Sequence, residues 1–217
     1  MSLNDTSNVV TSFLVALIVI VGLVTETKSL AANDAAVLVE GRDFVIKFPY
    51  EKPKKPQVVE FFSFMCPACF QREATVLRWK KQKPDSVELL KIPVSFGRAD
   101  WKLAARAFYI AEELKISEKF NKLMFQKIHI ENKRLRRLTD VEKIFIEMGI
   151  SKADFNKAAK SFGVDSKLRK ADFLVKKYKV PSVPYFLINF KYEASESSSQ
   201  NQDALFRLWN LLPSRDF

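Results

Sequence analysis

Residues 57–83 read QVVEFFSFMCPACFQREATVLRWKKQK, and no other stretch says as much about the fold. Its first part, 57–64, is rich in β-branched and aromatic residues and is mostly apolar at successive positions. That pattern is typical of a central strand buried on both faces. The part from 67 to 83 is predicted to be helical, and Pro84 ends it. The sequence therefore predicts a buried strand that leads directly into a helix.

The only two cysteines, Cys66 and Cys69, form one Cys-x-x-Cys at this junction. A thiolate at a helix N-terminus faces unpaired N–H groups and the positive end of the helix dipole, so its charged form is favoured. Pro67 fits the first helical turn, where its missing N–H costs nothing. From position, we expect Cys66, at the exposed tip, to be the attacking thiol, and Cys69, one turn further in, to resolve the mixed disulfide.

Two other interpretations of the cysteine pair remain open. The pair could be half of a zinc site, but the chain has no second pair, so zinc would require a dimer or a partner protein. It could also form a purely structural disulfide, although closing so short a loop contributes little chain entropy. We favour redox catalysis by the two thiols, with no metal and no cofactor.

The rest of the chain predicts a small mixed α/β sheet interrupted by helices. Strands are expected at 87–94 and 183–189, with a long helical stretch at 100–178 between them. A polar connector at 193–202 is expected to precede a closing helix at 203–212. Because the sheet is incomplete until the later strand returns, the helical stretch is an insertion in one fold.

Local signals divide the helical insertion into separate helices. Thr139–Glu142 and Ser151–Asp154 both have the spacing of a capping box, which predicts a helix start at each. Gly149 and Gly163 are predicted helix stops.

The composition bounds the class of protein. The chain has 217 residues, a net charge of +11, 47% hydrophobic residues and 19 phenylalanines, which is enough for a real core and excludes global disorder. Its basic clusters are scattered over several segments between apolar positions, so we expect solvated faces and no nucleic-acid partner. The one histidine, His129, lies between Ile128 and Ile130 and is expected to pack rather than to catalyse.

The N-terminus carries a candidate export segment at 1–31. The apolar run at 9–24 is short for a membrane span, which needs about 20 residues, but long enough for the core of a signal peptide. Small residues at 29–31 suit a signal peptidase, whereas 1–8 lacks Lys and Arg, so an uncleaved anchor and a buried core helix remain open. We expect the body, 32–217, to be exported to the oxidising periplasm.

The stretch 60–71, EFFSFMCPACFQ, together with Val183–Pro184 far downstream, resembles the DsbA family of periplasmic thiol–disulfide oxidoreductases, part of the thioredoxin superfamily. The similarity runs over about 40–192. It implies an α/β, thioredoxin-like fold with an inserted all-helical domain at about 98–179. It also implies a disulfide oxidase for newly exported polypeptides that is reoxidised by a quinone-linked membrane partner. We expect a monomer, since no added dimerisation domain is visible.

The resemblance assigns roles to residues on both sides of the insertion. Pro184 matches the family's cis-proline, which lies against the Cys-x-x-Cys. A cis bond there would leave the backbone of Val183 free to pair with an extended substrate, and Pro67 and Ala68 are expected to contact the substrate as well. The alternative is a trans proline in an edge strand.

Three charged residues are expected to support the cysteines. By the resemblance, Glu60 is the buried acid beneath Cys69 and takes a proton during exchange. A lone Glu in so apolar a run is unfavourable unless it is paired, and Lys91 on the second strand is the expected partner. Glu73, one turn past Cys69, matches another acid of the family, and a solvated helix face is the alternative for it.

Two departures from the family pattern limit the transfer. Ala68 stands where the best-known members have histidine, which removes a group that stabilises the thiolate, so we expect a less oxidising disulfide. Asn189–Phe190 replaces the Asn-Gly of a tight hairpin, so we expect a longer or irregular turn.

The first hypothesis for function is therefore a thiol–disulfide oxidase that acts on exported polypeptides. A disulfide reductase or isomerase on the same scaffold is the close alternative, because fine electrostatics around Cys66 decide the direction of exchange. A polypeptide-binding chaperone with an incidental disulfide is the alternative from a different class.

Overall fold

The computed structural model describes residues 37–217 of the chain. The predicted signal peptide or anchor at 1–31 lies outside the described residues. Within the described part, no helix is both long and apolar enough to cross a membrane.

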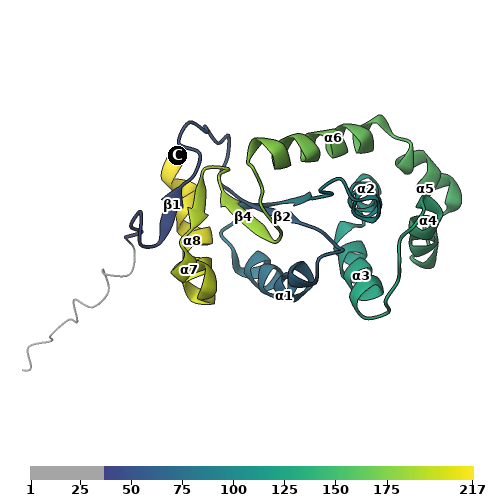
Figure 1. Cartoon of the computed structure of the whole chain (residues 1–217), viewed down its shortest axis with the longest axis horizontal. Helices are drawn as coiled ribbons and strands as arrows, with labels where there is room; N and C mark the ends of the chain where they lie inside the picture. The colour runs from purple at the N-terminus through teal and green to yellow at the C-terminus, as the bar shows by residue number, and fades with distance from the viewer. Residues whose placement is uncertain (1–36) are drawn as a thin grey trace, which may run out of the picture. The chain divides into compact units, whose positions relative to one another are not determined.

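A five-stranded mixed sheet, in the order β1-β5-β4-β2-β3, forms the centre of the fold (Figure 1). At its middle, β2 (Gln57–Phe62) runs parallel to β3 (Glu88–Pro93) and antiparallel to β4 (Tyr185–Ile188). The short strands β5 (Tyr192–Ala194) and β1 (Phe44–Ile46) extend the other side of the sheet, each antiparallel to its neighbour. All six residues of β2 are buried, as its apolar sequence predicted.

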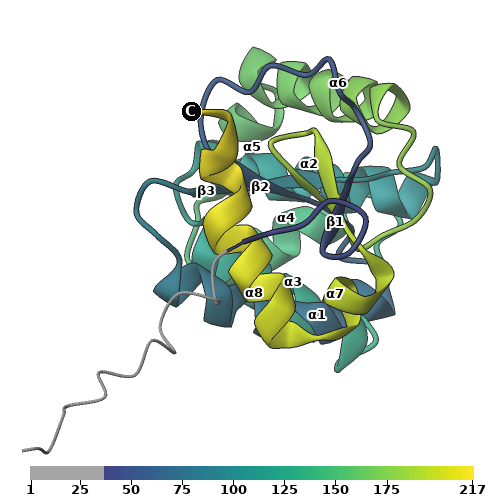
Figure 2. The same cartoon turned by 90° about the vertical axis from the view of Figure 1, so that its left-hand side faces the viewer.

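Helices cover both faces of the sheet. One face carries α1 (Pro67–Gln82) and the C-terminal α8 (Gln202–Leu211), and the opposite face carries α6 (Phe162–Lys177) (Figures 1 and 2). The two helices on the first face meet through Trp79 and Trp209, whose ring centroids lie 5.2 Å apart in an edge-to-face arrangement. This packing fixes α1, and hence the start of α1, against the sheet.

The helical insertion fills the chain between β3 and β4. It consists of α2 (Ala99–Glu113), α3 (Ser117–His129), α4 (Leu138–Glu147), α5 (Lys152–Ala159) and α6. The central member is α2, which contacts the four other helices and has eight buried residues, three of them aromatic. The predicted fold class, a thioredoxin-like α/β fold with an inserted helical domain, is confirmed.

Two of the predicted helix signals are confirmed. Ser151 is the N-cap of α5, and its Oγ accepts a hydrogen bond of 3.0 Å from the N–H of Asp154. Gly149 follows the end of α4 with a φ of +84°, the left-handed conformation that commonly ends a helix.

Two other helix signals were misread. The helix predicted to begin with a capping box at Thr139–Glu142 begins at Leu138, and the carboxylate of Asp140 accepts the backbone N–H groups of the residues just before the helix. Gly163 does not stop a helix, because it is the second residue of α6 and follows the N-cap Ser161.

The sequence missed two short elements, β1 and α7 (Glu196–Gln200), and predicted β5 only as a possible hairpin partner of the strand at 183–189. The predicted connector at 193–202 contains the end of β5 and the whole of the five-residue helix α7, and no strand was predicted at β1. Elements of three to five residues contain too few positions for a periodic pattern, so tertiary pairing alone reveals them.

The turn between β4 and β5 is tight, so the expectation of a longer or irregular turn was wrong. Asn189 and Phe190 both have positive φ, 54° and 58°, and a backbone hydrogen bond of 2.9 Å closes the turn across them. Tertiary contacts hold this conformation. The Phe190 ring stacks on Tyr178 at 4.8 Å, and the buried Asn189 side chain accepts the N–H of Gln57 at 2.9 Å.

Candidate active site

The two cysteines lie at the point where β2 passes into α1. Cys66 is the N-cap of α1 and Pro67 occupies the first helical position, as predicted. Both sulfurs are free thiols, and Cys69 is fully buried. Cys66 is not an exposed tip, since only 8% of it is accessible, whereas Pro67 and Ala68 between the cysteines are exposed. Pro67 and Ala68 therefore form the accessible surface beside Cys66.

The Val183–Pro184 segment lies directly against Cys66. The Val183–Pro184 peptide bond is cis, as the resemblance implied, and the Cys66 thiol donates to the Val183 carbonyl oxygen at 3.2 Å. Antiparallel pairing between β2 and β4, with Phe61 opposite Tyr185, brings the two segments together. The sheet thus places the backbone next to Pro184 within reach of anything bound at Cys66.

A charged cluster lies beneath the cysteines, formed by Glu60, Lys91 and Glu73. Glu60 and Lys91 are register partners on the parallel strands β2 and β3, so their side chains leave the same face of the sheet. Lys91 Nζ lies 3.1 Å from Glu60 Oε2 and donates a shorter hydrogen bond of 2.6 Å to Glu73 Oε2. The predicted pairing of Glu60 with Lys91 is confirmed, and the alternative of a solvated helix face for Glu73 is wrong, since Glu73 is buried.

Burial affects the pKa values of Glu60 and Lys91 within this cluster. Glu60 is completely buried, and among the described residues Lys91 is its only ion-pair partner. Burial raises the pKa of Glu60, and the nearby charge of Lys91 only partly opposes that shift. Burial alone would lower the pKa of Lys91, but Glu60 and Glu73 together raise it. Lys91 therefore stays charged beside Glu73, and the raised pKa of Glu60 favours the protonated form of that carboxyl group.

Cys69 is poised to accept a proton. Burial raises the pKa of the Cys69 thiol, and the charges of Cys66 and Glu60 raise it further. A thiolate formed at Cys69 is therefore unfavourable until it is protonated or bonded. When it is ionised, the Glu60 carboxylate lies close enough to raise the pKa of Cys69 electrostatically.

His129 contacts the active-site segment from the helical insertion, which the sequence did not predict. Its Nε2 lies 2.8 Å from the carbonyl oxygen of Phe64, and because a carbonyl only accepts, Nε2 carries the proton and donates. Its ring stacks on Phe70 at 4.8 Å with an interplanar angle of 10°. His129 packs, as expected, but on residues that flank Cys66 and Cys69 on either side. No local signal places position 129 near position 66.

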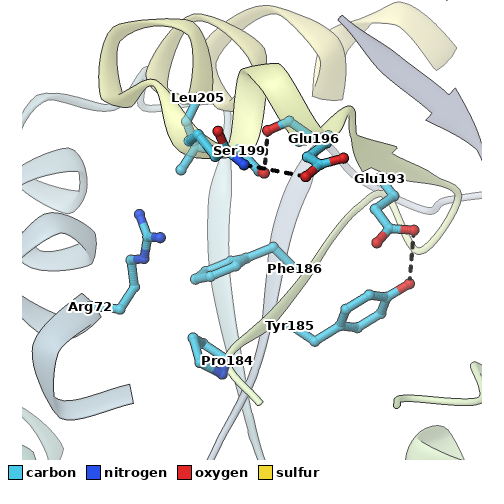
Figure 3. A pocket seen from close by; sticks show the side chains of 10 residues that line it. Arg72, Pro184, Tyr185, Phe186, Glu193, Glu196, Ser199 and Leu205 are labelled. Carbon is cyan, nitrogen blue, oxygen red and sulfur yellow. Dashed lines mark hydrogen bonds between the residues drawn. The ribbon is translucent and has the colours of Figure 1, made fainter. Parts of the chain in front are cut away.

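A cavity of about 480 Å³ lies beside Pro184 (Figure 3). Its walls come from α1, β4, β5, α7 and α8, and the rings of Tyr185 and Phe186 line it. The Tyr185 hydroxyl donates to Glu193 at 3.3 Å, and Arg72 contributes the only cation among the described lining residues. The cavity therefore continues the surface around the cysteines and is mixed apolar and charged.

The structure shows no candidate metal site between residues 37 and 217. No three His, Cys, Asp or Glu side chains converge there as a metal site requires. The acidic pair near Cys69 is instead bridged by a lysine, which serves as its counter-charge.

Comparisons with known proteins agree with this geometry. The family model of the DSBA-like thioredoxin domain matches residues 57–206. The thiol:disulfide interchange protein DsbA of Azotobacter vinelandii is 31% identical over 171 residues, which cover 77% of this chain and 78% of that protein. Its counterpart in Pseudomonas syringae is 30% identical over 166 residues, or 75% of this chain and 77% of that protein. The crystal structure of Pseudomonas aeruginosa DsbA superposes with a TM-score of 0.70 and 26% identity, covering 82% of this chain and 94% of that one. The chain therefore belongs to the family of DsbA-like thioredoxin domains and is a thiol:disulfide oxidoreductase.

Proposed function

We propose that this enzyme introduces disulfide bonds into exported polypeptides and that the Cys66–Cys69 disulfide is the oxidant. A client thiolate attacks Cys66 Sγ, the Cys66–Cys69 bond breaks, and Cys69 leaves as a thiolate that takes up a proton. A second client thiolate then attacks the client sulfur of the mixed disulfide and releases Cys66. The client loses two electrons and two protons, and the enzyme gains them.

The contact between Cys66 and Val183 carries this proposal. It places the first sulfur of the Cys-x-x-Cys, at the N-terminus of α1, against backbone that can pair with a client. Exposed Pro67 and Ala68 beside it offer the surface that a client meets first. Burial of Cys69 restricts the client to Cys66, so attack and resolution fall to different sulfurs.

Glu60 serves in this proposal as the proton donor to Cys69 when Cys69 leaves. The support is its complete burial, which raises its pKa even though Lys91 lies 3.1 Å away. Lys91 and Glu73 are the supporting pair. Their short hydrogen bond holds the lysine charge beside Glu60, so that Glu60 can return to the carboxylate once its proton is lost.

Turnover requires an oxidant for the reduced enzyme. We assign this role to a membrane partner that passes the two electrons to a quinone, acting in the periplasm on an enzyme that is a monomer. The segment 1–31, as a signal peptide or an uncleaved anchor, would deliver the chain there. Export would also place the cysteine pair in an oxidising compartment, where a disulfide can persist.

The direction of exchange is tested by equilibrating the full chain in glutathione buffers of known composition. An oxidase should have a Cys66–Cys69 potential above the glutathione poise, so that it donates its disulfide to clients. A potential near that of thioredoxin would instead assign the scaffold to reduction or isomerisation. If no exchangeable disulfide formed, and a Cys66→Ser variant kept full cellular function, the catalytic proposal would fail in favour of a polypeptide-binding chaperone.

A further inference from the structure

Arg72 is placed to recognise the client. It lies on α1, six positions after Cys66, and its half-buried side chain lines the cavity beside Pro184. In Figure 3 the Arg72 guanidinium extends from α1 along the side of the cavity away from Tyr185 and Glu193. No residue in the range 37–217 forms a hydrogen bond or an ion pair with this guanidinium, and its electrostatic neighbour Glu60 does not line the cavity, so its five donors remain available.

The acidic residues of the cavity do not neutralise Arg72. Glu193 is already engaged, since it lies 3.1 Å from Lys47 Nζ and accepts the Tyr185 hydroxyl. Glu196 is exposed on the rim, where its one side-chain hydrogen bond comes from Gln200 at 3.4 Å, and water screens its charge. Of the charged side chains that line the cavity, Arg72 is therefore the one that is partly buried and has no counter-charge among the lining residues.

The cavity is also continuous with the site of exchange. Pro184 lines it, and the adjacent Val183 carbonyl contacts Cys66. A client joined to Cys66 and paired along Val183 would therefore extend past Pro184 into the cavity, toward Arg72. The apolar ring of Phe186, on the Arg72 side of the cavity, accepts the client's carbon-rich side chains, and the guanidinium matches a carboxylate bidentately.

We infer that Arg72 selects client polypeptides that carry an acidic side chain near the reacting cysteine. The inference rests on the proposed function and adds to it a substrate class, unfolded segments with Asp or Glu close to the cysteine. Because such a pair is partly solvated, its effect on rate should be about two- to fivefold.

The test uses two model dithiol peptides that are identical except for Asp or Lys at the positions flanking one cysteine. The rate at which the oxidised full chain oxidises each peptide is measured at physiological salt, and the ratio of the two rates is the readout. Arg72→Glu is compared with Arg78→Glu, a change of equal charge at an exposed position of α1 that does not line the cavity. The matched control matters because the net charge of +11 attracts acidic peptides anyway.

The ratio separates recognition from chemistry. The pKa of Glu60 is raised mainly by burial, and Arg72 is among the cations that oppose the shift, so Arg72→Glu can alter every rate. A change that affects the oxidation of both peptides equally leaves the ratio of their rates unaltered. We expect the acidic peptide to lose its advantage in Arg72→Glu and in Arg72→Gln, and to keep it in Arg78→Glu.

Each outcome has one meaning. An equal ratio in Arg72→Glu and Arg78→Glu would overturn the inference, because the preference would then come from overall charge. Oxidation of the small neutral dithiol dithiothreitol is the independent check on the proposed function. If the wild-type chain oxidises dithiothreitol but shows no Arg72-dependent ratio, recognition fails and catalysis stands. If it oxidises neither dithiothreitol nor peptide, the proposed function itself fails.

Discussion

The Cys66 sulfur lies 3.2 Å from the carbonyl oxygen of Val183, a residue 117 positions further along the chain. The contact joins the start of α1 to the segment that precedes β4, across the whole helical insertion. It makes the two sulfurs inequivalent, because Cys66 faces this backbone and the exposed Pro67 and Ala68, whereas Cys69 is buried. The predictions below concern this asymmetry and the residues that maintain it.

Replacing Cys69 should trap the exchange reaction half-way. In Cys69→Ser, a client disulfide can still be attacked by Cys66, but no second enzyme thiol can release the client. We expect a stable mixed disulfide that is visible by mass spectrometry under non-reducing conditions. Cys66→Ser is the control, and it should form none. Equal trapping by both variants would mean that the two sulfurs are interchangeable.

Ala68→His should make the enzyme a stronger oxidant. The new side chain would sit between the cysteines, where a hydrogen-bonding or cationic group stabilises the thiolate and hence the reduced form. We expect the equilibrium with glutathione to shift by about tenfold, which is about 30 mV for this two-electron couple. Ala74→His, at an exposed position further along α1, is the control. An unchanged potential in Ala68→His would show that the helix terminus alone sets the thiolate stability.

Glu60→Gln should change the pH dependence of stability in a defined direction. The pKa of Glu60 is raised in the folded state, mainly by burial, so its proton stabilises the fold at low pH and is lost as pH rises through the raised value. Relative to Glu60→Gln, the wild-type chain should therefore lose stability from about pH 4 upward. Urea unfolding across pH 4 to 8 measures the difference. If the wild-type chain instead gained stability relative to Glu60→Gln as the pH rises, the assignment would be contradicted.

The same variant should slow exchange, because it removes the proposed proton donor to Cys69. Glu196→Gln, an exposed carboxylate outside the charged cluster, is the control for the rate of dithiothreitol oxidation. An exchange rate equal to that of the wild-type chain would remove Glu60 from the reaction.

Asn189→Ala should destabilise the turn that closes the outer part of the sheet. The Asn189 side chain is fully buried, accepts the N–H of Gln57 and donates to the carbonyl of Pro213 at 2.7 Å. Its removal leaves buried partners unsatisfied, which costs about 1–3 kcal/mol of unfolding free energy. The exposed amide Gln126→Ala should cost little by comparison. Similar urea midpoints for the two variants would refute the role of Asn189.

His129→Phe should weaken the connection between the helical insertion and the segment around Cys66. Phenylalanine keeps a ring to stack on Phe70 but leaves the Phe64 carbonyl without its donor, at a cost of about 1 kcal/mol. His129→Ala loses both contacts and should cost more. We expect thiol exchange to be slower in His129→Phe than in the wild-type chain, and slower still in His129→Ala. Phe155→Leu, a core change in α5, is the stability-matched control, and an equal effect of Phe155→Leu on the exchange rate would assign His129 a purely structural role.

Local sequence was enough to predict the elements that have a regular hydrophobic pattern or a recognisable motif. The buried strand at 57–62, the helix that begins at Pro67, and the cysteine pair between them follow from apolar runs, a proline at the first helical position and the Cys-x-x-Cys spacing. The resemblance supplied Pro184 and Glu60, which no local pattern would have selected. The burial cost of a lone carboxylate then predicted Lys91.

Tertiary structure decided what depends on contacts between distant segments. Lys91 bonds most closely to Glu73, and Glu73 is buried only because α1 packs over β3 at that point. The tight turn at Asn189–Phe190 departs from its sequence expectation, because stacking on Tyr178 stabilises a backbone conformation that Phe190 alone disfavours. Local sequence sets the period and chemistry of each element, since these depend on neighbouring residues. The environment of each side chain depends on residues brought together by folding, and so only the tertiary structure reveals it.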